Sequence, residues 1–286
     1  MTSKSDVPTT MDATIHAPGI DFKETFASGQ TFAFAPNGGG YWGVVDNRPA
    51  WADDGQKLIR CRAEDEAFWR GYFEPDKDYS DILAPFLESD PALAACVKAF
   101  AGIRILRQPV WEALCAFIIS ANNHQRRIES IYRKLSARFG RQIIWGGRSF
   151  YGFPSPEALA GADEQALRES GLGYRAPYMA TTAGMVAAGF SLDLDAMEYG
   201  DALKHLTKLS GVGEKVADCV LLFASRHTVA FPVDVWMERV LKAHYGFEGS
   251  RAAMKKEAQL RFGDYAGLLQ QYLFHGARTG LLSMEP

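Results

Sequence analysis

The pattern of turn residues and apolar spacing changes near residue 108, and this change limits the possible folds more than any other feature of the sequence. Before that point, short segments rich in β-branched and aromatic residues alternate with strong turn signals, such as the Pro-Asn-Gly-Gly-Gly run at 36–40. After it, apolar residues recur at the helical period over longer segments. The sequence therefore predicts an α+β fold, in which a small N-terminal antiparallel β-sheet domain packs on a mainly α-helical body.

Individual elements follow from the same signals. Candidate strands cover 31–35, 41–46 and 57–61, and helical segments follow near 64–70 and 91–100. Later helices are expected at 110–120, 125–139, 174–188, 200–209, 214–225, 235–245, 251–262 and 265–279, with another starting after the cap Ser155. We divide the chain into a disordered N-terminus at 1–15, a β-rich domain at 16–104 and a helical domain at 105–286.

Composition is typical of a soluble globular protein. Of the 286 residues, 47% are hydrophobic, which is enough for a substantial core. No apolar run approaches the roughly 20 residues that a membrane helix needs, and the polar start of the chain does not resemble a signal peptide. The four cysteines are too far apart for a zinc or iron–sulfur site, so we expect buried free thiols and no metal. We expect a cytoplasmic monomer that makes no membrane contact.

The charge distribution favours a nucleic-acid partner more than the net charge of −3 does. Residues 1–99 carry 9 Lys/Arg against 16 Asp/Glu, whereas residues 122–148 carry seven basic side chains against the single acid Glu129. A local basic surface can bind phosphates on an acidic protein, because fields are screened within about 10 Å at ordinary salt. The alternative is an ordinary solvated helix face.

The Leu-Ser-Gly-Val-Gly-Glu-Lys segment at 209–215 lies between two expected helices. Gly211 and Gly213 flank Val212, which allows a sharp hairpin and leaves helix-start amides free to bind an anion such as a DNA phosphate. Lys215 falls in the first turn of the second helix, where the helix dipole favours the neutral amine, a nucleophile able to attack a sugar C1′. The alternatives are a plain tight turn and an ordinary exposed lysine.

Asp234 follows nineteen residues after the lysine, in the segment Phe-Pro-Val-Asp-Val at 231–235. It stands at the start of an apolar helix, where an N-cap is the simplest role. A rigidly held capping carboxylate can also accept a proton from Lys215 or stabilise positive charge on a deoxyribose.

Leu-x-Gly-Val-Gly-x-Lys followed by Pro-Val-Asp resembles the helix–hairpin–helix DNA glycosylase superfamily. The resemblance implies a helix–hairpin–helix at about 200–225, whose residues Gly211, Val212 and Gly213 grip DNA phosphate. It implies that Asp234 is catalytic, and that a lysine at position 215 marks the members that act through a Schiff base and then nick the strand by β-elimination. It implies no cofactor, except that a monovalent cation can sit on the hairpin carbonyls.

Three further segments resemble the 8-oxoguanine glycosylases, and they give the expected base. In Ser-Gly-Gln-Thr-Phe at 28–32, the carbonyl of Gly29 would accept the N7 hydrogen that only the oxidised base carries. Near the C-terminus, Gln270 matches the glutamine that reads the Watson–Crick edge, and Phe274 matches the stacking phenylalanine. Cys219, one turn after the lysine, matches a cysteine that stacks on the other face of the base. Core packing is the alternative for Phe274 and Cys219.

The same resemblance assigns residues to the opposite strand. Asn122 and Arg127 match the segment that fills the emptied helix and contacts the widowed cytosine, while Tyr174 and Arg175 match the wedge and a second cytosine-reading arginine. Surface loop residues are the alternative. Trp236 departs from the pattern, because the animal enzymes have a phosphate-binding histidine there and tryptophan offers one donor and no charge.

These features predict a bifunctional glycosylase and lyase that removes 8-oxoguanine opposite cytosine from double-stranded DNA, at the nucleoid of a bacterium. An alkylpurine glycosylase of the same architecture is an alternative, although such enzymes usually lack the lysine. A non-catalytic helix–hairpin–helix module is another, but it would need neither Asp234 nor Gln270. An endonuclease-III-like enzyme is disfavoured because the cysteine cluster is absent and a β domain precedes the helices.

Overall fold

The N-terminal part is a five-stranded antiparallel sheet, seen in the computed structural model of the protein, which describes residues 12–283. The strands are β1 (Asp12–His16), β2 (Phe34–Asn37), β3 (Gly40–Val45), β4 (Arg48–Asp53) and β5 (Leu58–Arg62), in the spatial order β1-β5-β4-β3-β2. The turn between β3 and β4 consists of Asp46 and Asn47, both with positive φ (49° and 60°), as a tight two-residue hairpin requires.

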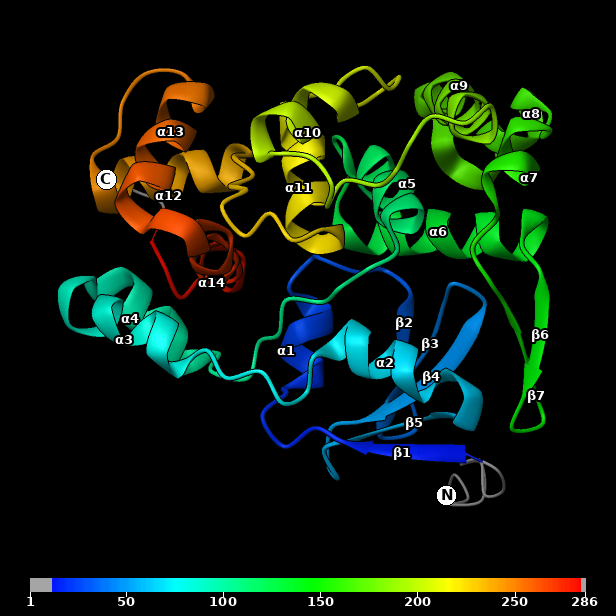
Figure 1. The fold of residues 1–286 in the computed structure, drawn as a ribbon, viewed down its shortest axis with the longest axis horizontal. Helices are drawn as coiled ribbons and strands as arrows, with labels where there is room; N and C mark the ends of the chain where they lie inside the picture. The colour runs from blue at the N-terminus through cyan, green and yellow to red at the C-terminus, as the bar shows by residue number, and fades with distance from the viewer. Residues whose placement is uncertain (1–11, 284–286) are drawn as a thin grey trace.

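Two helices cover one face of the sheet, and their side chains form the core of the N-terminal part together with those of the strands. Helix α1 (Phe22–Ala27) starts at the N-cap Asp21, and α2 (Glu66–Phe73) follows the short 3₁₀ turn η1 (Ala63–Asp65). Side chains from both helices and the inner sheet face pack together, including Phe22, Phe34, Trp69, Tyr72 and Phe73. Figure 1 shows α1 and α2 lying against the strands.

The helical body surrounds the almost fully buried α5 (Val110–Ser120). Its other helices are α6 (Gln125–Phe139), α7 (Pro156–Ala160), α8 (Glu164–Leu167), α9 (Ala176–Ala187), α10 (Tyr199–Leu206), α11 (Glu214–Ala224), α12 (Val235–Tyr245), α13 (Arg251–Phe262) and α14 (Ala266–Thr279). Short turns η2 (Arg168–Leu172), η3 (Gly173–Arg175) and η4 (Gly263–Tyr265) precede α9 and α14. The expected α+β fold, with a small antiparallel sheet on a mainly helical body, is confirmed.

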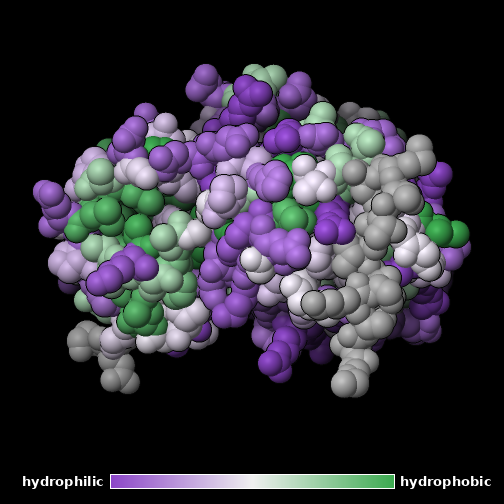
Figure 2. Space-filling model, turned by 90° about the horizontal axis from the view of Figure 1, so that it is seen from below, coloured by the Kyte–Doolittle hydropathy of each residue, from purple (hydrophilic) through white to green (hydrophobic). Residues whose placement is uncertain are grey.

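The expected N-terminal boundary needs one correction, and two further features of the fold were not expected. Residues 12–15 belong to strand β1, paired with β5, and are not disordered; residues 1–11 lie outside the described part. Residues 80–99, within the expected β-rich domain, form helices α3 (Ser80–Ser89) and α4 (Pro91–Ala99), whose buried side chains join the core of the helical body beside α14. Figure 2 shows the molecule from below, with apolar side chains gathered on the side where Figure 1 places α3 and α4. Leu87 of α3 is 43% exposed.

The second unexpected feature is a β-hairpin within the helical half, β6 (Gln142–Trp145) and β7 (Arg148–Tyr151). It extends from the end of α6 along the N-terminal sheet (Figure 1). Trp145 and Phe150 pack on Trp42 of β3, with ring centroids 5.3 and 5.4 Å apart. The hairpin thus holds the two halves together.

Glu112 of α5 is a second link between the halves. Its buried carboxylate accepts the backbone N–H of Asp46 at 2.7 Å and the hydroxyl of Tyr132 at 2.9 Å. Burial raises the pKa of Glu112 to about 7, although the two hydrogen bonds oppose this shift. In the described part of the chain, no helix is long and apolar enough to cross a bilayer.

Candidate active site

The hairpin between α10 and α11 presents exposed backbone, as expected for a helix–hairpin–helix. Gly211 has φ +79°, and a Cβ there would lie 2.8 Å from the side chain of Tyr178, so glycine is required at this turn. Val212 is buried and anchors the hairpin to the core. Gly213 is exposed and is the N-cap of α11 without any side-chain cap, so the first amides of α11 are open to a ligand.

Lys215 is half-buried in the first turn of α11, and its amine lies inside the protein surface. Nζ lies 3.5 Å from Oγ of Ser120 and 5.7 Å from the ring centroid of Phe117. Among residues 12–283 it forms no ion pair within 4 Å. An amine that contacts a hydroxyl and an aromatic face, and no carboxylate, is available to react with a bound molecule.

Asp234 caps α12 and faces the same pocket as the lysine. Its Oδ1 accepts the backbone N–H groups of Trp236 and Met237, both at 2.9 Å, and within residues 12–283 no hydrogen bond involves its Oδ2. The buried Pro232 and Val233 fix the approach to the cap. The carboxylate is therefore held rigidly by one oxygen while the other can serve the site.

One pocket joins the residues that the sequence singled out for catalysis and base recognition. Lys215, Asp234, Gly29, Cys219, Gln270 and Phe274 all line it. Four further lining residues were missed in the sequence: Phe117, Phe223, Pro232 and Gln271. A wider opening continues from this pocket and is lined in addition by Ser120, Asn123, His124, Gln125, Trp236 and Arg278.

Gly29 lies in the turn after α1, not in a strand, and has φ +79°. A Cβ at this position would lie 2.7 Å from Nη1 of Arg278 and 3.4 Å from the ring of Phe274. Gln271 donates from Nε2 to the carbonyl of Ser28 at 3.0 Å, which ties the turn to α14 across 243 residues of sequence. Only glycine allows both this backbone conformation and this close approach.

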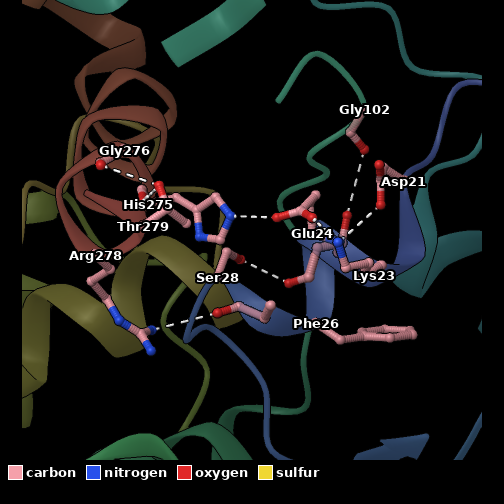
Figure 3. A network of polar contacts seen from close by, with 12 residues as sticks. Asp21, Lys23, Glu24, Phe26, Ser28, Gly102, His275, Gly276, Arg278 and Thr279 are labelled. Atoms are coloured by element: carbon pink, nitrogen blue, oxygen red, sulfur yellow. Dashed lines mark hydrogen bonds and ion pairs between the residues drawn. The ribbon is translucent and has the colours of Figure 1, made fainter. Parts of the chain in front are cut away.

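A partly buried hydrogen bond between side chains strengthens the link between α1 and α14. Nε2 of His275 lies 2.8 Å from Oε2 of Glu24, and Figure 3 shows the two side chains pointing toward each other from the two helices. Burial lowers the pKa of His275, while the hydrogen bond to Glu24 acts in the opposite direction. Two residues just before Gly29, Glu24 and Ser28, are therefore bonded to α14.

Gln270 is 4% exposed and presents an unused acceptor. Its Nε2 donates to the carbonyl of Pro232 at 3.1 Å, while its Oε1 is buried without a hydrogen-bond partner. Leaving such a group unpaired costs about 1–3 kcal/mol, so a ligand donor in the pocket would be favoured. Cys219 is also buried, and burial raises the pKa of its thiol to about 11 despite the nearby Lys215, so the thiol is protonated at neutral pH.

The residues assigned to the opposite strand lie on an exposed rim. Asn122 has φ +52°, and its Nδ2 donates to the hydroxyl of Tyr174, 3.3 Å away; Tyr174 is 51% exposed. Arg127 is exposed on the first turn of α6. Arg175 differs, because it is 5% exposed and its guanidinium donates to the carbonyl of Ala121 and stacks 4.3 Å from the Tyr174 ring. It supports the loop that carries Asn122.

Two family models match consecutive parts of this chain. Residues 14–114 match the N-terminal domain of 8-oxoguanine DNA glycosylase, and residues 115–263 match the HhH-GPD superfamily of base excision DNA repair proteins. A probable N-glycosylase/DNA lyase of Methanothermobacter thermautotrophicus is 35% identical over 267 residues, which cover 84% of this chain and 81% of that protein. The N-glycosylase/DNA lyase OGG1 of Arabidopsis thaliana is 28% identical over 87% of this chain and 75% of its own length.

Solved structures agree with the sequence matches. MBOgg1 in complex with a low-affinity DNA ligand superposes with a TM-score of 0.88 at 32% identity, over 96% of this chain and 98% of that one. The Clostridium acetobutylicum 8-oxoguanine glycosylase/lyase, in complex with double-stranded DNA containing cytosine opposite 8-oxoguanine, has the same TM-score at 28% identity, again over 96% and 98%.

Proposed function

Because the chain belongs to the HhH-GPD superfamily of base excision DNA repair proteins, in its 8-oxoguanine DNA glycosylase family, we propose that it excises 8-oxoguanine opposite cytosine with Lys215 as nucleophile. The observation that carries this proposal is the shared pocket, into which the amine of Lys215 and the carboxylate of Asp234 both open. The chain is accordingly a bifunctional DNA N-glycosylase and abasic-site lyase.

The chemistry begins when the damaged nucleotide is turned out of the duplex into the pocket. The neutral amine of Lys215 attacks C1′, the N-glycosidic bond breaks, and the base leaves with the bonding electron pair and takes up a proton. Asp234 stabilises the positive charge that develops on the deoxyribose. Loss of a proton and ring opening give a Schiff base, and removal of a C2′ proton then expels the 3′ phosphate by β-elimination, which cuts the strand 3′ to the lesion.

Base recognition uses four residues of the pocket. The carbonyl of Gly29 accepts the N7–H that guanine lacks and 8-oxoguanine carries. The unpartnered Oε1 of Gln270 accepts from the N–H donors on the Watson–Crick edge of the purine. Phe274 and Cys219 pack on the faces of the flipped ring.

The exposed rim reads the intact strand. Asn122 and Tyr174 fill the gap that the flipped base leaves, and Arg127 donates to the orphaned cytosine, while the buried Arg175 holds the loop that carries Asn122. The open amides of the Gly211–Gly213 hairpin bind a backbone phosphate, and a monovalent cation can occupy its carbonyls. The reaction needs no redox cofactor, and we propose that the protein works as a monomer on chromosomal DNA in the cytoplasm.

A strand-cleavage assay on a panel of duplexes tests the function. The purified protein is incubated with duplexes that carry 8-oxoguanine opposite each of the four bases, an alkylated purine opposite thymine, or an undamaged G:C pair. We expect cleavage to be fastest with 8-oxoguanine opposite cytosine. Preferential release of the alkylated purine without strand cleavage would instead identify an alkylpurine glycosylase, and intact DNA in every arm would identify a DNA-binding module.

A further inference from the structure

Arg278 places a guanidinium at the mouth of the base pocket, and the proposed function does not use it. It lies on α14, one turn after Phe274 and therefore on the same helix face. It lines the opening together with Gly29, Lys215 and Asp234. Figure 3 shows its side chain extending from α14 toward the backbone that follows Phe26.

The guanidinium is held in place but is poorly neutralised. Nη2 donates to Oε1 of Gln125 at 2.7 Å, whereas Nη1 has only a long contact of 3.5 Å to the carbonyl of Ala27. No carboxylate lies within 4 Å of it in the described part of the chain, and the side chain is half-buried. Burial lowers the pKa of Arg278, and the more distant Asp234 and Glu129 oppose this shift. A partly desolvated cation with unused donors favours an acceptor from the substrate.

The position of Nη1 indicates which acceptor it meets. Oxidation of guanine adds a hydrogen to N7 and a carbonyl oxygen to the adjacent C8. A base whose N7–H points to the carbonyl of Gly29 must bring its O8 close to the same glycine. Nη1 of Arg278 is the nearest side-chain atom to the Cβ position of Gly29, 2.7 Å away, and the guanidinium carbon lies 5.5 Å from the ring centroid of Phe274.

We infer that Arg278 is a specificity-determining residue that donates a hydrogen bond from its guanidinium to O8 of the flipped 8-oxoguanine. This inference rests on the proposed role of Gly29. It adds a second residue that recognises the oxidised edge of the base: the carbonyl of Gly29 accepts from N7–H, and the guanidinium of Arg278 donates to O8. A backbone phosphate is the competing acceptor. The location favours O8, because Arg278 packs beside the base-reading residues of α14 while the open amides for phosphate lie at the start of α11.

The test compares a substrate that carries the oxidised base with one that has lost the whole base, and with it O8. Arg278→Met keeps most of the apolar stem and removes the donors; Arg226→Met, at an exposed arginine that lines neither the pocket nor its opening, is the matched control. Single-turnover rate constants are measured for base excision from 8-oxoguanine opposite cytosine and for strand cleavage at a preformed abasic site opposite cytosine. Loss of a charged hydrogen bond predicts excision about 10- to 100-fold slower for Arg278→Met, with abasic-site cleavage changed less than about threefold.

The outcomes separate the possible roles. Equal losses on both substrates would mean that Arg278 binds phosphate, and no loss on either would mean that it contacts nothing in the substrate; each result overturns the inference. If Arg278→Met does not fold, Gln125→Leu removes the acceptor that orients the guanidinium, and the same selective loss is expected at smaller size. Failure of the unmodified protein to excise 8-oxoguanine would instead remove the proposed function itself.

Discussion

The proposed base pocket and the rim that we assign to the opposite strand are built in different ways. In the pocket, Gln270 and Cys219 are each 4% exposed, and the turn at Gly29 is bonded to α14 by Gln271. On the rim, Tyr174 is 51% exposed and its contact to Asn122 is a single 3.3 Å hydrogen bond between side chains. The pocket is therefore organised before DNA binds, which favours catalysis by fixed groups, whereas the rim completes its contacts on the DNA.

The largest expected effect concerns the nucleophile. Lys215→Gln removes the amine but keeps a polar side chain of similar length beside Ser120. We expect excision to fall by more than about 10³-fold, because loss of a covalent nucleophile leaves only binding and charge stabilisation. The affinity for lesion-bearing duplex, measured by fluorescence anisotropy, should change less than about threefold. A comparable loss of binding would show that the lysine mainly contacts phosphate. The pocket would then not be a catalytic site.

A smaller effect is expected where the pocket reads the base. Gly29→Ala forces a side chain into a left-handed backbone position at φ +79° and against Arg278. In the inactive Lys215→Gln background, we expect the preference for 8-oxoguanine over guanine duplex to fall roughly tenfold, while affinity for undamaged DNA stays the same. An unchanged preference ratio would remove Gly29 from recognition.

On the rim, a substitution should lower the affinity for both lesion duplexes and not the preference between bases. Tyr174→Ala is expected to weaken binding of the 8-oxoguanine and abasic duplexes alike, by about 3- to 10-fold, because the wedge serves any flipped nucleotide. The melting temperature should shift by less than about 2 °C, since the side chain is exposed. Tyr151→Ala, an exposed tyrosine that lines neither the pocket nor its opening, is the matched control. A loss of affinity confined to the 8-oxoguanine duplex would show that Tyr174 responds to the damaged base as the pocket residues do, and would contradict the proposed difference between rim and pocket.

The smallest effect on activity concerns Glu112, which lies on α5, the helix that also carries the pocket residue Phe117. The pKa of Glu112 is about 7 in the folded protein, above the ordinary 4.5, so folding favours the protonated carboxyl. Its contribution to the free energy of unfolding is therefore complete below about pH 4.5 and is lost as the pH rises through 7. Glu112→Gln should remove this loss and raise the free energy of unfolding at pH 8 by about 1–3 kcal/mol, with little change near pH 4.5. Thermal unfolding of both proteins at the two pH values measures this difference. Destabilisation of the variant at pH 8 would show that the charged carboxylate is needed to hold Asp46 and Tyr132.

How far the sequence predicts the molecule depends on how local each signal is. The helix Gln125–Phe139 was predicted at its observed ends, because its amphipathic period and Gly140 are local. Strand β4 was missed because Pro49 argues against a strand, and α3 because Pro85 lies inside it. The β6–β7 hairpin had a readable signal in the Gly146-Gly147 turn, whose positive φ values of 54° and 70° suit a tight hairpin.

The site follows the same rule. Lys215 and Asp234 stand out because a hairpin and a helix start mark each of them locally. Gln271 was missed, since its bond to the carbonyl of Ser28 joins residues 243 positions apart and no periodicity reports it. Arg278 could have been noticed from its helical spacing to Phe274, but its closeness to Gly29 depends on the packing of α14 against α1.

Covalent trapping of the enzyme on DNA tests the central claim most directly. The protein is incubated with 8-oxoguanine duplex in the presence of sodium borohydride, which reduces a Schiff base to a stable amine, and the adduct is digested and mapped by mass spectrometry. We predict that one deoxyribose fragment is attached at Lys215, and that Lys215→Gln gives no adduct. Release of the base without an adduct, or an adduct at another amine, would contradict the account.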